Sequence, residues 1–187
     1  MAVMGWLVVV CLAFLPLLKY QSAPGKPSKT SPTWPAASKL PRTTYGDTLV
    51  MFIHPQCPCT AASLDQLDKL AAKVGEGFRA LVVVEQPSYM DKAWTDTKYA
   101  RHAARITGVT TVVDHGQAEA HLFGATTSGD TFVYDREGLM QFHGGLTPGR
   151  GHEGDCLGYD SVLSLMRGRP AAAVPFAPAF GCALFNH

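Results

Sequence analysis

The feature that most constrains this chain is the stretch Thr48–Leu70, TLVMFIHPQCPCTAASLDQLDKL, where a short apolar run gives way to a different periodicity. Leu49–Ile53 is almost continuously apolar and contains β-branched and aromatic residues, which is typical of a strand buried on both faces. From Thr60 onward apolar residues recur every three or four positions, which predicts a helix that ends near Gly75. The stretch therefore predicts a strand, a turn and a helix in succession.

Two cysteines, Cys57 and Cys59, fall in the predicted turn, at or just inside the N-terminus of the helix. The unpaired backbone N–H groups and the positive end of the helix dipole favour a thiolate there. The thiolate is the reactive form of cysteine, and low thiol pKa values occur in such surroundings. Pro58 suits a first helical position, where no N–H is needed. The pattern predicts a redox-active turn.

This unit resembles the active site of the thioredoxin superfamily, and Phe52 precedes Cys57 by the spacing usual for thioredoxins. It is most similar to the membrane-anchored RedB-type bacterial proteins, and the shared segments are HPQCPCTAASLDQL, FGATTSGDTFVYDREG, GRGHEGD and FGCALF. The resemblance implies a thioredoxin-like α/β fold, a three-layer sandwich, with an N-terminal membrane helix. It also implies thiol–disulfide oxidoreductase activity on protein thiols or disulfides, with Cys57 as the nucleophile and Cys59 as its nearest resolving partner.

The chain departs from the thioredoxin pattern at two places. Thioredoxins pair their cysteines as C-x-x-C, but here Thr60 takes the second position and the extra thiol, Cys59, makes a C-x-C pair. A Cys57–Cys59 disulfide would close a tighter ring, and strained disulfides are the more oxidising ones. In the loop that faces the cysteines, Gly129 or Asp130 stands where thioredoxins have a cis-proline.

Two other interpretations of the cysteines stay open. Buried free cysteines are common, so both thiols could be structural. Alternatively, the domain is a copper-binding metallochaperone on the same fold, because soft thiolates select Cu(I). Its ligands would then be Cys57, Cys59 and a histidine, for which His152 in the polar loop GRGHEGD is the best candidate.

The N-terminal part of the chain predicts attachment to a membrane. Residues 1–20 are apolar enough for an anchor, and Gln21-Ser22-Ala23 followed by Pro24 is a poor cleavage site, so we expect the anchor to be retained. Residues 21–44 contain five prolines and are expected to be an extended linker, and residues 45–187 a thioredoxin-like domain with a C-terminal tail.

The charge pattern and the family resemblance place the domain on opposite sides of the membrane. Lysines follow the apolar run and none precedes it, so the positive-inside rule predicts a cytoplasmic domain. The resemblance implies a single-pass protein of the bacterial cell membrane with its domain on the periplasmic side, and we follow the resemblance. A net charge of +1 gives no reason to expect nucleic acid as a partner.

Beyond the central unit, the sequence predicts alternating strands and helices, then a hairpin, a final helix and a tail. The expected elements are strands at 78–85, 109–114, 131–135 and 139–143 and helices at 91–106, 117–123 and 159–169. The tail ends in an apolar cluster, FGCALF, whose burial could hold Cys182 in a fixed place. We expect that place to be near the Cys57–Cys59 turn, which would make Cys182 a third thiol; pairing with Cys156 is the competing expectation.

Overall fold

The structure is a computed structural model that describes residues 2–26, 29–169 and 172–185, and its strands form one mixed sheet of order β3-β2-β1-β4-β5-β6. The strands are β1 Thr48–Ile53, β2 Ala80–Gln86, β3 Val109–His115, β4 Thr131–Tyr134, β5 Met140–Gly144 and β6 Phe176–Ala177. Strands β1, β2 and β3 are parallel to one another, whereas β4 is antiparallel to both β1 and β5. The short β6 runs parallel to β5.

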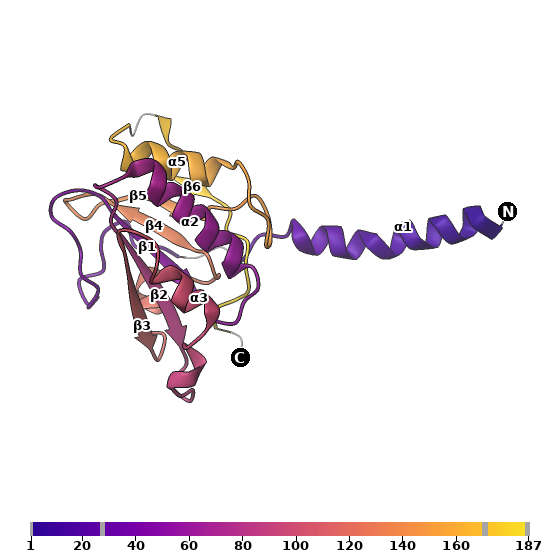
Figure 1. Cartoon of the computed structure of the whole chain (residues 1–187), viewed down its shortest axis with the longest axis horizontal. Helices are drawn as coiled ribbons and strands as arrows, with labels where there is room; N and C mark the ends of the chain where they lie inside the picture. Colours follow the sequence, from indigo (N-terminus) through magenta and orange to yellow (C-terminus); the bar gives the residue numbers. More distant parts are fainter. Residues whose placement is uncertain (1, 27–28, 170–171, 186–187) are drawn as a thin grey trace.

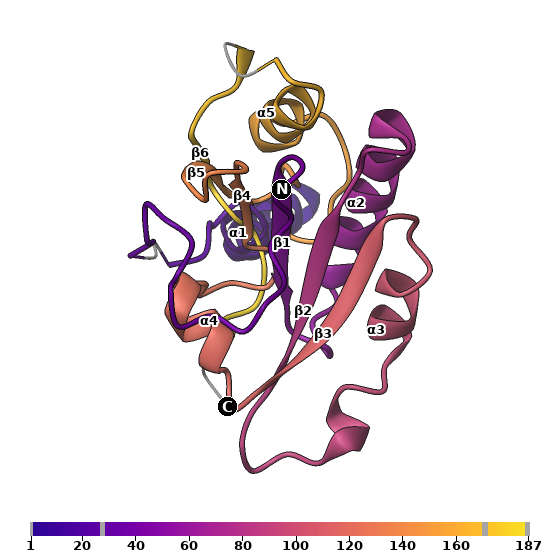
Figure 2. The same cartoon turned by 90° about the vertical axis from the view of Figure 1, so that its left-hand side faces the viewer.

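Helices cover both faces of this sheet (Figures 1 and 2). The covering helices are α2 Thr60–Val74, α3 Lys98–Ala103, α4 Ala118–Phe123 and α5 Leu157–Met166, whereas α1 Ala2–Gln21 projects away from the sheet. Helices α2, α3 and α5 share one apolar cluster with the sheet, and α4 contributes to a second cluster on the opposite face. The α/β fold predicted as a three-layer sandwich is therefore confirmed, and an apolar N-terminal helix precedes it.

The central unit forms as the sequence predicts. All six residues of β1 are buried, because a strand in the middle of a sheet with helices on both faces has no solvent-exposed side. The apolar stripe of α2 faces the first cluster through Leu64, Leu67 and Leu70. Helix α2 ends where Gly75 adopts a φ of 82°, a left-handed conformation that favours glycine.

The segment predicted as one helix at 91–106 is instead two short helices. A 3₁₀ helix covers Lys92–Trp94, and α3 starts only at Lys98. The break lies at Thr95–Thr97, where the Thr97 hydroxyl accepts a hydrogen bond from the Ala100 N–H and caps a new helix. A side chain that caps a helix competes with continuation of the preceding one, which periodicity alone does not reveal.

The segment between α1 and β1 lies against the domain over much of its length. Its Trp34 ring packs edge-on against Phe123 and Tyr134, at centroid distances of 5.1 and 5.3 Å. The Trp34 N–H donates to the Gly138 carbonyl, and Pro32 accepts a hydrogen bond from the Met140 N–H. The residues expected to form a linker thus contribute contacts to the second apolar cluster.

Candidate functional site: three thiols beside a buried acid

The two cysteines of the C-x-C pair lie where β1 passes into α2. Cys57 is in the turn and only 1% exposed, and Cys59 occupies the N-cap position of α2. Thr60, the first residue of α2, donates its hydroxyl to the His54 carbonyl and contacts the Ser128 hydroxyl at 2.9 Å. The turn is thereby fixed to a loop from the other half of the chain.

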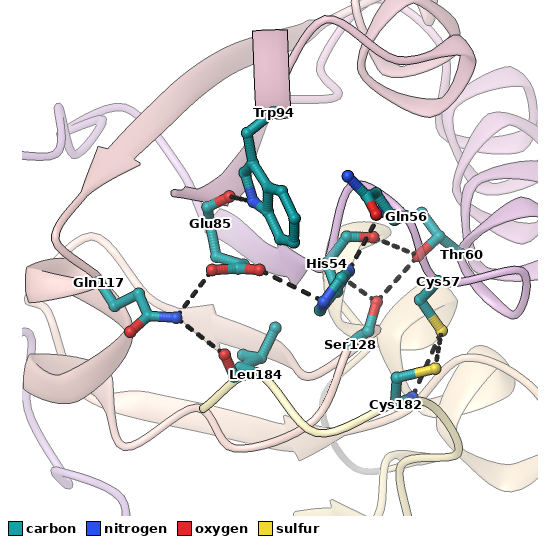
Figure 3. A network of polar contacts seen from close by, with 10 residues as sticks. All are labelled: His54, Gln56, Cys57, Thr60, Glu85, Trp94, Gln117, Ser128, Cys182 and Leu184. Carbon is teal, nitrogen blue, oxygen red and sulfur yellow. Dashed lines mark hydrogen bonds and ion pairs between the residues drawn. The ribbon is translucent and has the colours of Figure 1, made fainter. Parts of the chain in front are cut away.

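The C-terminal tail brings a third thiol to this turn (Figure 3). The sulfur of Cys182 lies 2.6 Å from the sulfur of Cys57, and the Cys182 N–H points at the same sulfur at 3.4 Å. A disulfide bond is about 2.05 Å long, so a small movement would join the two residues. Cys156, the competing partner for Cys182, instead caps the N-terminus of α5.

The tail is held in place like a short strand. The Ser128 N–H donates to the Cys182 carbonyl at 2.8 Å, and the Leu184 N–H donates to the Thr126 carbonyl at 2.9 Å. Between these bonds Ala183 forms an antiparallel bridge with Thr127. The tail therefore occupies the backbone edge of residues 126–128, the loop that faces the active-site turn.

This loop takes its shape from an aspartate and a glycine. The Asp130 carboxylate accepts hydrogen bonds from the N–H groups of Thr126 and Thr127. Gly129, with a φ of 95°, packs against α2, where a Cβ atom would lie 2.8 Å from the Ser63 hydroxyl. Gly129, one of the two residues expected where thioredoxins have a cis-proline, thus brings the loop close to α2.

The three thiols differ in the direction of their pKa shifts. A hydrogen bond from the Cys182 thiol, more than any other contact, lowers the pKa of Cys57 from its ordinary 9.0 to about 5. The same bond and burial raise the pKa of Cys182, and burial together with the charge on Cys57 raises that of Cys59. At neutral pH, Cys57 is therefore the thiolate and the other two are thiols.

A buried polar network lies behind the turn, at the edge where parallel strands β1 and β2 end (Figure 3). The His54 Nε2 atom lies 3.5 Å from a carboxylate oxygen of Glu85, whose side chain is fully buried. His54 Nδ1 accepts the Gln56 N–H, so the ring proton is on Nε2 and faces the acid. Gln117 donates to Glu85 and to the Leu184 carbonyl, which connects the acid to the tail.

The polar loop after β5 reaches the site through its arginine. The Arg150 guanidinium donates to the Gly181 carbonyl, next to Cys182, and its charge lowers the pKa values of Cys59 and Cys182 in opposition to burial. His152, the candidate copper ligand, is exposed and forms a backbone bridge with Gly149. Across the described residues, no group of three or more His, Cys, Asp or Glu side chains is arranged to hold a metal ion.

Comparisons with known proteins rest on structure, because no protein-family model and no curated protein sequence matches this chain. A hypothetical protein from Sinorhizobium meliloti is 20% identical, with a TM-score of 0.60 over 87% of this chain and 93% of that one. An uncharacterized conserved protein from Geobacillus kaustophilus is 16% identical, with a TM-score of 0.59 over 89% and 93%.

A secreted disulfide oxidoreductase from Mycobacterium tuberculosis is 13% identical, with a TM-score of 0.43 over 68% of this chain and 81% of that one. A protein described as thioredoxin-like, in its oxidised form, is 14% identical, with a TM-score of 0.47 over 83% of this chain and 99% of that one. This chain has a thioredoxin-like fold. The fold that the resemblance implies is confirmed, whereas the RedB-type resemblance stays a prediction.

Sequence reasoning singled out the three thiols of this thioredoxin-like domain but not their polar neighbours. It missed Glu85, Gln117, Ser128 and Arg150 as parts of the site. The sequence could have placed Glu85 near the cysteine turn. Glu85 ends an apolar run, and the carboxyl ends of parallel strands meet at one edge of a sheet. Gln117 had no such signal, since its role depends on where the tail docks.

Proposed function

We propose that this protein is a thiol–disulfide oxidoreductase whose nucleophile is Cys57. The observation that carries the proposal is the gathering of three thiols at one turn, where the buried Cys57 sulfur lies 2.6 Å from that of Cys182 and Cys59 occupies the N-cap position of the adjoining helix. The hydrogen bond from Cys182 lowers the pKa of Cys57 to about 5. A thiolate at neutral pH attacks disulfides, and a neighbouring thiol then releases the product by forming an internal disulfide. The substrates expected for such a site are protein thiols or disulfides.

We further propose that α1 tethers this domain to the bacterial cell membrane, with the domain on the periplasmic side. Val3–Gln21 has a mean hydropathy of 2.0 and none of its described side chains is buried, as in a membrane-spanning helix, although a signal sequence shares these properties. The resemblance to the RedB-type group implies the same placement. Neither nucleic acid nor a resident cofactor is needed for the proposed chemistry.

A redox titration of the full-length protein in detergent micelles tests the chemistry. The protein is equilibrated with mixtures of reduced and oxidised glutathione, quenched in acid, and its free thiols are counted by mass after alkylation. We expect one two-electron couple between about −270 and −120 mV, the range of thioredoxin-type proteins. Cys57→Ser should abolish it, and Cys156→Ser, which retains a capping group on α5, should not.

Three results would contradict the proposal. A protein that shows no couple in this range lacks exchangeable thiols, and a couple that survives Cys57→Ser does not use this nucleophile. Tight, stoichiometric Cu(I) binding by the reduced protein, with no accessible disulfide, would instead favour the copper-binding alternative. The described residues offer that alternative no histidine grouped with the cysteines.

A further inference from the structure

The C-terminal tail is anchored more strongly than an ordinary chain end. Leu184 is fully buried in the second apolar cluster, and its carbonyl accepts a hydrogen bond from Gln117. Phe185 stacks on His121, with ring centroids 4.2 Å apart. Gly181 lies so close to Ser128 that a Cβ atom would be 2.0 Å from the Ser128 carbonyl oxygen. These contacts fix Cys182, between Gly181 and Leu184, against the active-site turn.

We propose that residues 181–184 form a resolving strand: Cys182, rather than Cys59, completes the exchange that Cys57 begins, and the strand must leave residues 126–128 for a substrate to reach Cys57. This inference rests on the proposed function and names the second thiol of its reaction. Two observations carry it, the 2.6 Å separation of the sulfurs and the backbone pairing of the tail with the loop.

The exchange balances in two steps. The Cys57 thiolate attacks a substrate disulfide, so a Cys57–substrate bond forms, the substrate S–S bond breaks, and one substrate thiolate leaves and takes up a proton. Cys182 then loses its proton and attacks the Cys57 sulfur, which forms the Cys57–Cys182 disulfide and releases the second substrate thiolate. The substrate gains two electrons and the protein dithiol loses them. The reverse sequence oxidises a substrate dithiol.

Once Cys57 carries the substrate as a mixed disulfide, the electrostatics of the site favour Cys182 over Cys59 as the attacking thiolate. Its raised pKa comes first from the hydrogen bond with Cys57, then from burial and from the Cys57 charge. A mixed disulfide at Cys57 removes both the charge and that hydrogen bond, while Arg150 continues to favour a Cys182 thiolate. Burial remains at both thiols, and Arg150 favours both thiolates, but burial is the largest cause of the raised pKa only at Cys59. The mixed disulfide therefore relieves the largest cause of the shift at Cys182 and not at Cys59.

The burial of Cys57 explains why the strand must move. With Cys57 only 1% exposed, a protein disulfide cannot approach its sulfur while Cys182 lies against it. The same displacement frees the Ser128 N–H and the Thr126 carbonyl, which the tail now occupies. An extended substrate segment could pair with these groups in place of the tail, as added strands do at sheet edges.

Disulfide mapping in two variants of the full-length protein tests the resolving role, with oxidised glutathione as the probe. In the wild type we expect a Cys57–Cys182 disulfide. Cys59→Ser should retain this link and the two-electron couple, whereas Cys182→Ser should lose the couple and accumulate Cys57–glutathione. A wild-type Cys57–Cys59 link, or a couple retained in Cys182→Ser, would overturn the inference. Loss of all exchange in the wild type would instead overturn the proposed function.

Gly181→Ala tests the displacement without removing a thiol. The added Cβ collides with Ser128, so the strand should detach. Detachment also removes the Cys182 hydrogen bond that lowers the Cys57 pKa, so rates are compared per Cys57 thiolate, and on this basis Cys57 should react with glutathione disulfide at least tenfold faster. Resolution of the mixed disulfide should become slower by a similar factor. Gly77→Ala is the matched control, because nothing lies within 4 Å of that position. Unchanged rates in Gly181→Ala, with the fold shown intact by circular dichroism, would contradict the need for displacement.

Discussion

At Cys57, a second thiol stabilises the thiolate more than the start of α2 does. The sequence predicted a low pKa from the helix N-terminus, and the direction is as expected. The leading cause is different, because the hydrogen bond from Cys182 contributes most and the backbone contacts contribute less. The pKa of this residue therefore depends on a partner 125 positions away in the chain.

Removing that partner should return the Cys57 pKa toward its ordinary value. In Cys182→Ala the side-chain donor is lost, so thiolate absorbance at 240 nm should appear well above the wild-type midpoint of about pH 5. The signal of Cys57 is isolated by subtracting the spectrum of Cys57→Ser. Cys156→Ala is the control, because burial raises the pKa of the Cys156 thiol, which therefore does not contribute to the absorbance change near pH 5. An unmoved midpoint would show that the turn alone lowers the pKa.

The depressed pKa also predicts how stability depends on pH. The folded reduced protein ionises Cys57 near pH 5, whereas the unfolded chain does so near the ordinary value of 9.0. Folding therefore releases a proton when the pH lies between 5 and 9. The contribution of Cys57 to the free energy of unfolding should grow as the pH rises from 5 to 9, and acidification should remove it again. Above pH 9 the raised pKa of Cys182 reverses the slope, because the folded protein then holds the extra proton.

Urea unfolding under reducing conditions measures this dependence. The difference between wild type and Cys57→Ser cancels the contributions of the histidines and other groups common to both proteins. We expect the difference in unfolding free energy to grow between pH 5 and 9. A difference that stays constant across this range would mean that the Cys57 pKa is the same in the folded and unfolded chains.

At the scale of the elements, the tail behaves as an additional edge strand held by one buried side chain. Leu184→Ala should cost about 2 kcal/mol of tail docking, the lower end of the range for a buried leucine. The Leu184 and Ser128 amides, which bond across the tail and loop, should then exchange about 30-fold faster in hydrogen–deuterium exchange. Leu157→Ala, at a position 70% exposed, should leave both amides unchanged. Equal exchange in the two variants would mean that other contacts hold the tail.

Elements whose sequence signal is local could be predicted, and contacts between distant segments could not. Strand β1, the turn and α2 follow from periodicity and from Gly75, because these depend on neighbours in the sequence. The break between Lys92–Trp94 and α3 was missed, since a threonine cap outweighs helical periodicity there. The contact of Ser128 with Thr60 depends on how β4 pairs with β1, which no local pattern encodes.

At the scale of the whole molecule, the folded unit includes residues that composition assigns to a linker. We predict that Trp34→Ala lowers the unfolding free energy by about 2 kcal/mol, less than a fully buried tryptophan because the ring is only half-buried. Tyr45→Ala, at a position 98% exposed in the same segment, is the control and should change it little. Chemical denaturation checks both. Equal stabilities would mean that residues 21–44 act as a tether in solution.

Helix α1 projects from the domain (Figure 1), and Arg150 connects its C-terminal end to the tail that carries Cys182. The Arg150 N–H donates to the Gln21 carbonyl, and its guanidinium lies 4.7 Å from the ring centre of Tyr20. The same arginine contacts Gly181 in the resolving strand. If α1 spans a bilayer, its end at Gln21 lies at the membrane surface, and Arg150 links that end to Gly181 of the tail.

The last prediction concerns whether α1 is retained as the anchor. Val3–Gln21 is 19 residues long, so it extends about 28 Å, close to the thickness of a hydrocarbon core of about 30 Å. The poor cleavage site at Gln21–Pro24 argues against its removal. We expect the protein to stay in membranes washed with carbonate and its N-terminal peptide to be found by mass spectrometry, whereas a variant lacking residues 2–21 should be extracted. Release of the full-length chain by carbonate, or a mature N-terminus beyond residue 21, would show that the apolar helix is not an anchor.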